Sequence, residues 1–337
     1  MLFRTLLALM GAVTLLTGEP VDAQPAQTVG FQHLEIPTAS GPPVEVGVWY
    51  PSDAPATAHR LQLYEQTVAE NAPVAGGRLP LVVISHGNGG GFAGHYDTAL
   101  SLAHAGFVVA ALTHPGDNYR DQSQTLDLPS RPGQLKRLVD YMLATWPQHG
   151  AIDPEEIGAF GFSAGGFTVL AAAGGEADLT QIAAHCSAHP TFFDCKLMAR
   201  FSDQAAALEK VHPVWVHDPR LKAIVSAAPA LGFAFGKAGL RGVTIPVQLW
   251  RAEDDQVLPP PYYAEAVLAD LPTKPEYHVA PHAEHLDFLA PCSSALAIEA
   301  PSICQSEPGF DRAAFHAAFN AEVVRFFKAH LSGAPRL

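Results

Sequence analysis

Ser163 lies at the centre of the sequence Gly-Phe-Ser-Ala-Gly, residues 161–165, which constrains the fold more than any other stretch of the chain. A short apolar run, 157–160, precedes it, and the residues that follow, 167–173, have the composition of a helix that stops at a pair of glycines. Glycine is favoured where two backbones approach so closely that a side chain would collide. The pattern therefore predicts a sharp, strained turn between a strand and a helix, with the serine standing clear of the sheet. A glycine-rich loop with a chance serine is the alternative interpretation.

Strand-like and helix-like segments alternate along most of the chain. Buried strands are expected at 79–85, 107–112 and 221–228, and the stretch 134–146 carries apolar side chains at helical spacing. This alternation predicts a mostly parallel central sheet with helices on both faces. A Pro- and Ala-rich stretch runs to about Gly77. Further strand-like segments are 29–36, 44–50, the run from Val247 and 277–280, and further helix-like segments are 96–105 and 312–331.

The alternation breaks after the predicted turn and helix. About 176–220, between that helix and the next strand, the chain carries its first two cysteines, several aromatic residues and helical pieces such as 203–209. An insertion of this length beside a serine of this kind predicts a cap over a pocket. A surface excursion with no role in chemistry is the alternative.

The first 23 residues have the features of a signal peptide. Arg4 supplies a short basic region, the apolar run 5–16 is too short to span a bilayer comfortably, and Val-Asp-Ala at 21–23 offers small residues where a signal peptidase cleaves. We expect cleavage after Ala23, and an exported, periplasmic or secreted chain, 24–337, that folds as one domain with the insertion. A retained membrane anchor is the alternative, and no later apolar run is long enough for a transmembrane helix.

The formal net charge of the chain is −13. A balance this acidic disfavours nucleic acids and anionic membrane surfaces as partners, because both would repel it. Hydrophobic residues make up 48% of the sequence, which is ordinary for a globular protein and excludes a disordered or fibrous one.

Export would place the four cysteines in an oxidising compartment. Two disulfide bridges are then expected, with three possible connectivities, and proximity in sequence favours Cys186 with Cys195 and Cys292 with Cys304. No pair has the CxxC spacing of a zinc site and no HExxH motif is present, so neither a metal nor a cofactor is expected.

Four short stretches carry a family resemblance. They are Ser-His-Gly-Asn-Gly-Gly at 85–90, Ala-Gly-Phe-Val-Val-Ala at 105–110, Gly-Phe-Ser-Ala-Gly-Gly at 161–166 and His-Leu-Asp-Phe at 285–288. With a serine, an acid and a histidine in that order, the chain resembles the α/β-hydrolases. Within that superfamily it resembles the bacterial dienelactone-hydrolase-like group related to platelet-activating-factor acetylhydrolases. The resemblance spans nearly all of 24–337 and implies an α/β-hydrolase fold.

The chain departs from its relatives at the nucleophile and at the acid. Dienelactone hydrolases proper use cysteine where this chain has Ser163. The plasma acetylhydrolases place the acid after the strand that follows the nucleophile, but here that strand offers no carboxylate. The acid is therefore expected after the next strand, where Glu253, Asp254 and Asp255 all fit by chemistry. The turn common in hydrolases, Gly-x-x-Asp with a proline four residues later, favours Asp255 over Asp254, although Ala252 stands in the glycine position.

A serine nucleophile needs a base to take up its proton. His285 lies in the loop after the last strand, where the fold places the base, and His282 is the second candidate. His316 and His330 fall in the terminal helix and are expected at the surface.

Two main-chain N–H groups should stabilise an oxyanion. One belongs to Ala164, directly after the serine. By resemblance to the acetylhydrolases, the other belongs to Asn88, although the sequence 86–89 could be no more than a turn. His114 and Asp117, in the loop after the strand 107–112, could line the pocket.

These expectations together describe an exported serine hydrolase that cleaves small-molecule carboxylic esters through an acyl-enzyme, with a triad of Ser163, Asp255 and His285. An amidase or peptidase on the same fold is one alternative. A catalytically silent binding protein is another, and the intact order of serine, acid and histidine disfavours it, because binding alone would not need all three.

Overall fold

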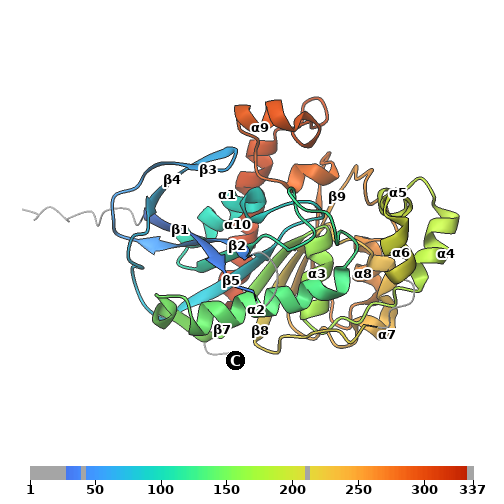
Figure 1. Cartoon of the computed structure of the whole chain (residues 1–337), viewed down its shortest axis with the longest axis horizontal. Helices are drawn as coiled ribbons and strands as arrows, with labels where there is room; N and C mark the ends of the chain where they lie inside the picture. The colour runs from blue at the N-terminus through green and yellow to red at the C-terminus, as the bar shows by residue number, and fades with distance from the viewer. Residues whose placement is uncertain (1–27, 39–42, 209–212, 332–337) are drawn as a thin grey trace, which may run out of the picture.

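The computed structural model describes residues 28–38, 43–208 and 213–331 (Figure 1). The signal peptide expected at 1–23 lies outside these residues. Within them, no helix has both the length and the apolar character needed to cross a lipid bilayer.

A mixed sheet forms the centre of the molecule, and its described strands run in the order β10-β9-β8-β7-β5-β6-β2-β1-β4-β3. The strands from β10 to β6 pair in parallel, while β2 is antiparallel to both β6 and β1. The predicted mostly parallel sheet is therefore confirmed. The strands are β1 Thr28–Ile36, β2 Val44–Ser52, β3 Thr57–Leu61, β4 Tyr64–Glu70, β5 Leu79–Ser85, β6 Val108–Leu112, β7 Ile152–Phe162, β8 Leu221–Ala227, β9 Val247–Ala252 and β10 Glu276–Ala280.

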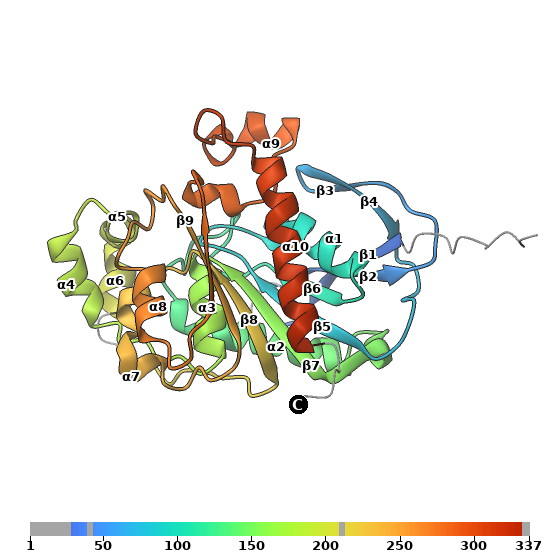
Figure 2. The same ribbon diagram turned by 180° about the vertical axis from the view of Figure 1, so that it is seen from behind.

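Helices cover both faces of this sheet, as predicted. The helices α2 and α3 lie on the face toward the viewer in Figure 1, and α10 crosses the opposite face, beside α1, in Figure 2. The helices are α1 Tyr96–His104, α2 Arg131–Ala144, α3 Ala164–Ala172, α4 Gln181–Ala188, α5 Phe193–Arg200, α6 Ser202–Leu208, α7 Gly236–Leu240, α8 Ala264–Asp270, α9 Ser294–Glu299 and α10 Arg312–Leu331.

The two faces of the sheet carry separate apolar cores, and β5 contributes to both. Leu81 and Val83 pack in the core under α2 and α3, whereas Val82 and Ile84 pack in the core under α1 and α10. Successive side chains of a strand point to opposite faces, so a strand buried on both sides must be apolar throughout. This requirement explains why the apolar run 79–85, which forms β5, was recognisable in the sequence.

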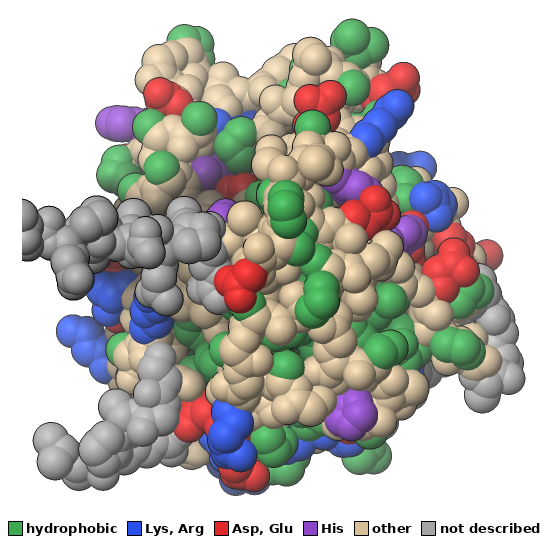
Figure 3. Space-filling view, turned by 90° about the vertical axis from the view of Figure 1, so that its left-hand side faces the viewer, with side chains coloured by type: hydrophobic (Ala, Val, Ile, Leu, Met, Phe, Trp, Pro, Cys, Tyr) green, Lys and Arg blue, Asp and Glu red, His purple; other side chains and the backbone are tan. Residues whose placement is uncertain are grey.

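The Pro- and Ala-rich stretch before Gly77 contains a β-hairpin that was not predicted from the sequence. β3 and β4 pair antiparallel within it, and β3 forms one edge of the sheet. β3 is short and includes His59 and Arg60, and polar side chains on a short edge strand disfavour pairing with another sheet. Figure 3 views the end of the molecule nearest β1 and β4, where charged and histidine side chains are scattered among apolar ones.

The insertion at 176–220 forms the helices α4, α5 and α6, which lie together beside α7 and α8 in both views (Figures 1 and 2). A disulfide joins Cys186 in α4 to Cys195 in α5. The insertion is anchored to the rest of the chain by aromatic and polar contacts: the His185 ring stacks on Phe233 with centroids 3.8 Å apart, and the Tyr263 hydroxyl donates to Asp194 over 2.9 Å.

The second disulfide joins Cys292 to Cys304 and encloses α9, which projects from the molecule in Figures 1 and 2. Both pairs are those that proximity in sequence favoured. His316 was expected at the surface but is buried. Its two ring nitrogens form hydrogen bonds with the Asp97 carboxylate and the Asp287 carbonyl at 2.6 and 2.8 Å.

Acid should destabilise the folded chain through another buried histidine, His95, at the end of the short helix η1 Phe92–His95. It is 1% exposed and packs against the rings of Phe160 and Phe162 at 5.2 and 5.4 Å. Burial lowers its pKa from 6.5 to about 4, although the charge of Asp97 opposes the shift. Between these two values the unfolded chain binds a proton that the folded chain does not. Stability therefore falls as the pH drops through this window, by up to about 1.4 kcal/mol per pH unit for this residue.

Thermal unfolding between pH 7 and pH 4.5 tests this expectation. The wild type should lose more in Tm across the range than a His95→Gln variant, since the variant has no proton to take up at this position. Parallel losses in the two proteins would show that His95 does not contribute to the acid sensitivity.

Candidate active site

Ser163 lies at the tip of the turn between β7 and α3, as predicted. Its φ of 56° and ψ of −117° are unusual for any residue other than glycine, and such strain is concentrated at functional sites. The two flanking glycines permit the turn. A Cβ added to Gly161 would lie 2.0 Å from the carbonyl oxygen of Gly165, and one added to Gly165 would lie 1.9 Å from that of Ser85. Neither position can hold a side chain while strand and helix stay this close.

The carboxyl ends of three parallel strands bring a serine, a carboxylate and a histidine together. Ser163 follows β7, Asp255 follows β9, and His285 follows β10 at the start of the short helix η5 His285–Phe288. The Nε2 atom of His285 is 3.0 Å from the Oγ atom of Ser163, and its Nδ1 atom is 2.8 Å from the Oδ2 atom of Asp255. Asp255 and His285 are buried, whereas Ser163 is partly accessible.

The structure separates Asp255 from its neighbours in the acidic turn. The Oδ1 atom of Asp255 accepts the main-chain N–H groups of Val257 and Leu258 at 2.9 and 2.7 Å. Asp254 has a side chain that is 48% exposed and lies 3.8 Å from the ring of His282, which is itself at the surface. Glu253 also faces that ring. The alternative acids and the alternative histidine are therefore grouped with one another, away from Ser163.

The ionisation of Asp255 determines which nitrogen of His285 carries the proton. Burial alone would raise the pKa of Asp255, but the adjacent His285 ring and the N–H groups of Leu258 and Val257 outweigh it and lower the pKa. An ionised carboxylate accepts hydrogen bonds and cannot donate, so Nδ1 of His285 must be the protonated nitrogen. Its Nε2 atom is then free to accept the hydroxyl proton of Ser163, which is the geometry of a general base.

Known proteins share this fold. Residues 82–212 match the model of the prolyl oligopeptidase family. A ferulic acid esterase from Streptomyces cinnamoneus superposes over 94% of this chain and 93% of its own, with a TM-score of 0.59 and 19% sequence identity. The chain has the α/β-hydrolase fold. No curated protein matches the sequence, and at 19% identity the structural likeness establishes the fold alone.

Ala164 is placed in this fold where its main-chain N–H could stabilise an oxyanion. It is the first residue of α3, and the N–H groups of a first helical turn have no partner within the helix. These groups also lie at the positive end of the helix dipole, which favours negative charge beside Ser163.

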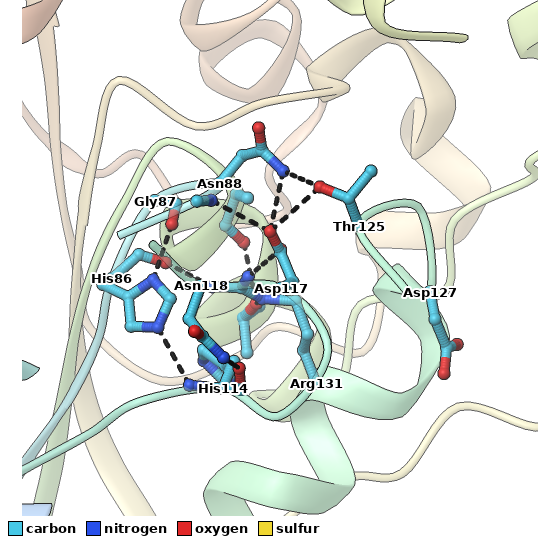
Figure 4. Close-up of polar contacts among 12 residues, drawn as sticks. His86, Gly87, Asn88, His114, Asp117, Asn118, Thr125, Asp127 and Arg131 are labelled. Atoms are coloured by element: carbon cyan, nitrogen blue, oxygen red, sulfur yellow. Dashed lines mark hydrogen bonds and ion pairs between the residues drawn. The ribbon is translucent and has the colours of Figure 1, made fainter. Parts of the chain in front are cut away.

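Asn88 belongs to the loop 86–91, which follows β5 and which we call the glycine loop. The loop reaches the nucleophile, because a Cβ on Gly87 would be 3.2 Å from the Cβ of Ser163. The Asn88 side chain is committed elsewhere: its Nδ2 atom donates to the Oδ1 atom of Asp117 at 2.8 Å and to the Oγ1 atom of Thr125 at 2.6 Å (Figure 4). The resemblance implied a role for the main-chain N–H of Asn88 rather than for its side chain, and that role stays a prediction.

His114 and Asp117 lie beneath the glycine loop, where both are almost fully buried. The main-chain N–H of His114 donates to Nε2 of His86, and Asp117 forms an ion pair with Arg131 (Figure 4). Sequence reasoning missed Arg131 and Thr125. Arg131 is the first residue of a helix, a position where a charged side chain is usually solvated, so the sequence around it carries no sign of burial.

Proposed function

We propose that this protein is an exported serine hydrolase that cleaves carboxylic esters through an acyl-enzyme intermediate. The observation that carries the proposal is the chain of contacts from Ser163 through His285 to Asp255, with separations of 3.0 and 2.8 Å in a largely buried site. We propose that the protein belongs, within the fold, to the dienelactone-hydrolase-like group, which its motifs at 85–90, 105–110, 161–166 and 285–288 resemble.

The reaction proceeds in two displacements. In the first, Oγ of Ser163 attacks the ester carbonyl carbon while Nε2 of His285 takes its proton, and the carbonyl oxygen becomes an oxyanion. The N–H groups of Ala164 and Asn88 stabilise that charge. The intermediate expels the alcohol, which receives the proton from His285, and the acyl group stays on Ser163. Water, activated by the same histidine, then releases the carboxylic acid and restores the enzyme. Asp255 keeps its negative charge throughout and stabilises the imidazolium.

We propose that the helices α4 to α6 act as a cap, and that the chain from Gln24 folds as one domain with this insertion. The cap is held against the loops that follow β8 and β9, through Phe233 and Tyr263. The loop after β8 also contacts the nucleophile directly, since the N–H of Ala230 donates to the carbonyl of Ser163 at 3.0 Å. The loop after β8 thus connects the proposed cap to the turn that carries Ser163.

Amide hydrolysis is the second candidate, because the prolyl oligopeptidase family matches residues 82–212. An ester function is favoured by the likeness to the ferulic acid esterase, which extends over 94% of the chain. Export is supported by the two disulfides, which persist in oxidising compartments.

A pair of matched substrates and one covalent probe test the proposal. The purified protein should hydrolyse a p-nitrophenyl ester and leave the p-nitroanilide of the same acyl group intact over the same time. A fluorophosphonate should label the wild type and not a Ser163→Ala variant. Faster cleavage of the anilide would assign the protein to the amidases, and an unlabelled wild type would make it a binding protein.

A further inference from the structure

An ion pair between Arg131 and Asp117 is buried beneath the glycine loop, outside the set of residues that react. Arg131 begins α2, and Asp117 lies in the loop after β6 (Figure 4). Their side chains are 1% and 4% exposed, and Nη1 of Arg131 is 2.5 Å from Oδ2 of Asp117. Removing two charges from water is costly, and apolar side chains of similar volume often serve stability as well or better. A role other than stability would account for such a pair.

The carboxylate of Asp117 holds the glycine loop from one side. One oxygen, Oδ2, faces Arg131, and the other accepts the main-chain N–H of Gly89 at 2.9 Å and Nδ2 of Asn88 at 2.8 Å. Thr125 donates to the same oxygen at 3.2 Å. The peptide group between residues 88 and 89 is thus fixed by a charged acceptor, and charge-assisted hydrogen bonds are about twice as strong as neutral ones.

The guanidinium of Arg131 holds the peptide group between residues 86 and 87, which precedes the one that carries the N–H of Asn88. Its Nη2 atom donates to the carbonyl oxygen of His86. The peptide group that carries the N–H of Asn88 lies between residues 87 and 88, so the ion pair restrains both of its neighbours. The intervening carbonyl, that of Gly87, accepts Nδ1–H of His86 at 2.6 Å. A peptide group is planar, and its N–H points away from its carbonyl, so these contacts determine where the N–H of Asn88 points.

The same guanidinium reaches the helix that supplies the second donor. Nε of Arg131 donates to Oγ1 of Thr168 at 3.1 Å, and that hydroxyl donates to the carbonyl of Ala164 at 2.7 Å. The planar fork of arginine can bind three separate acceptors at once, which a lysine cannot do with the same geometry. Arg131 therefore connects the loop of Asn88 to the first turn of α3, the two walls between which an oxyanion would form.

We propose that Arg131 and Asp117 are positioning residues that set the distance between the two oxyanion donors, Asn88 and Ala164, and thereby the rate of acyl transfer. This inference rests on the proposed ester hydrolysis. A displacement of about 1 Å at a reacting centre can cost about a hundredfold in rate, and the loss of one oxyanion donor costs about a hundred- to a thousandfold in kcat.

A double variant separates positioning from stability. Arg131→Met together with Asp117→Leu removes both charges, so no unpaired charge is left buried, and the protein should remain folded. We expect kcat for a p-nitrophenyl ester to fall by roughly 10- to 100-fold while KM changes little. The inhibition constant of a boronic acid, whose tetrahedral adduct with Ser163 places an oxygen between the donors, should rise by a similar factor. The carbonyl oxygen of the bound substrate forms weaker hydrogen bonds with these donors than the oxyanion does, so KM should change little.

A matched control is Arg220→Met. Arg220 also pairs with two carboxylates, Asp218 and Asp140, at 2.6 and 2.7 Å. It lies at the amino end of β8, however, whereas Ser163 follows the carboxyl end of the parallel strand β7. This variant should lose Tm without losing kcat. A double variant at 131 and 117 that is folded and keeps the kcat and boronate affinity of the wild type would overturn the proposal.

If the double variant does not fold, the single variant Arg131→Lys tests the positioning role. Lysine keeps the positive charge beside Asp117 but cannot also reach His86 and Thr168, so kcat should fall with KM preserved, and an unchanged kcat would refute the positioning role. These outcomes differ from a failure of the proposed function, in which the wild type itself would not hydrolyse the ester.

Discussion

Replacing Ser163 with alanine should abolish ester hydrolysis and leave the fold unchanged. Alanine lacks the Oγ atom that attacks the carbonyl, and kcat should fall by roughly a millionfold, as in other serine enzymes that lose the nucleophile. Alanine has the same Cβ as serine, so it fits the same backbone at φ 56° without a new collision. We expect the circular dichroism spectrum and the Tm of the variant to match those of the wild type, while p-nitrophenol release falls to a residual rate.

Ser123→Ala serves as the control for this substitution, because Ser123 is exposed and lies in the loop after β6. Its turnover should equal that of the wild type. Near-normal turnover in Ser163→Ala would mean that the nucleophile is another residue, and the role of the turn between β7 and α3 would have to be abandoned.

Asp255→Asn should lower kcat by about four orders of magnitude, as the corresponding change does in a serine-protease triad. The asparagine side chain can present its NH₂ group to Nδ1 of His285, which then accepts a hydrogen bond there and carries its proton on Nε2. A protonated Nε2 cannot take the proton of Ser163. This orientation of the asparagine is favoured because the N–H groups of Val257 and Leu258, which now donate to Oδ1 of Asp255, would keep the amide oxygen on their side.

Asp254→Asn tests the choice of acid with the same chemistry one residue away. Because the Asp254 side chain is 48% exposed and faces His282, its loss should change kcat by a small factor at most. Rates for both variants, measured at saturating ester and normalised to the active protein, give the ranking. A larger loss in Asp254→Asn than in Asp255→Asn would transfer the role of the acid to Asp254.

The sequence was sufficient to predict those parts of the site that depend on local geometry. The glycines around Ser163 are required by contacts within a single turn, so their spacing is visible in the chain. The buried strand β5 was recognised because both of its faces are covered. The bridges between Cys186 and Cys195 and between Cys292 and Cys304 join near neighbours, and proximity was enough to favour them.

Contacts between distant segments could not be predicted. Arg131 is buried because residues from the glycine loop, from the loop after β6 and from α3 surround it, and no pattern around residue 131 encodes those neighbours. His316 was expected on the surface of a helix, but Asp97, which is distant in sequence, accepts a hydrogen bond from it. The hairpin of β3 and β4 was missed because short, polar edge strands have little of the apolar signal that marks central ones.

The position of His285 in the sheet has a consequence for how activity and folding are related. Among the described strands, β10 is the outermost on its side and pairs with β9 alone, whereas Ser163 follows β7, a central strand. The free energy of local opening varies across a protein and is lowest where the fewest contacts must break. A strand held on one side can separate while the central strands stay paired. With His285 as the proposed base, we expect the fraction of molecules that is ready to react to depend on local opening at the margin of the sheet. Substitutions that stabilise the central core should then raise the stability of the fold without enlarging that fraction.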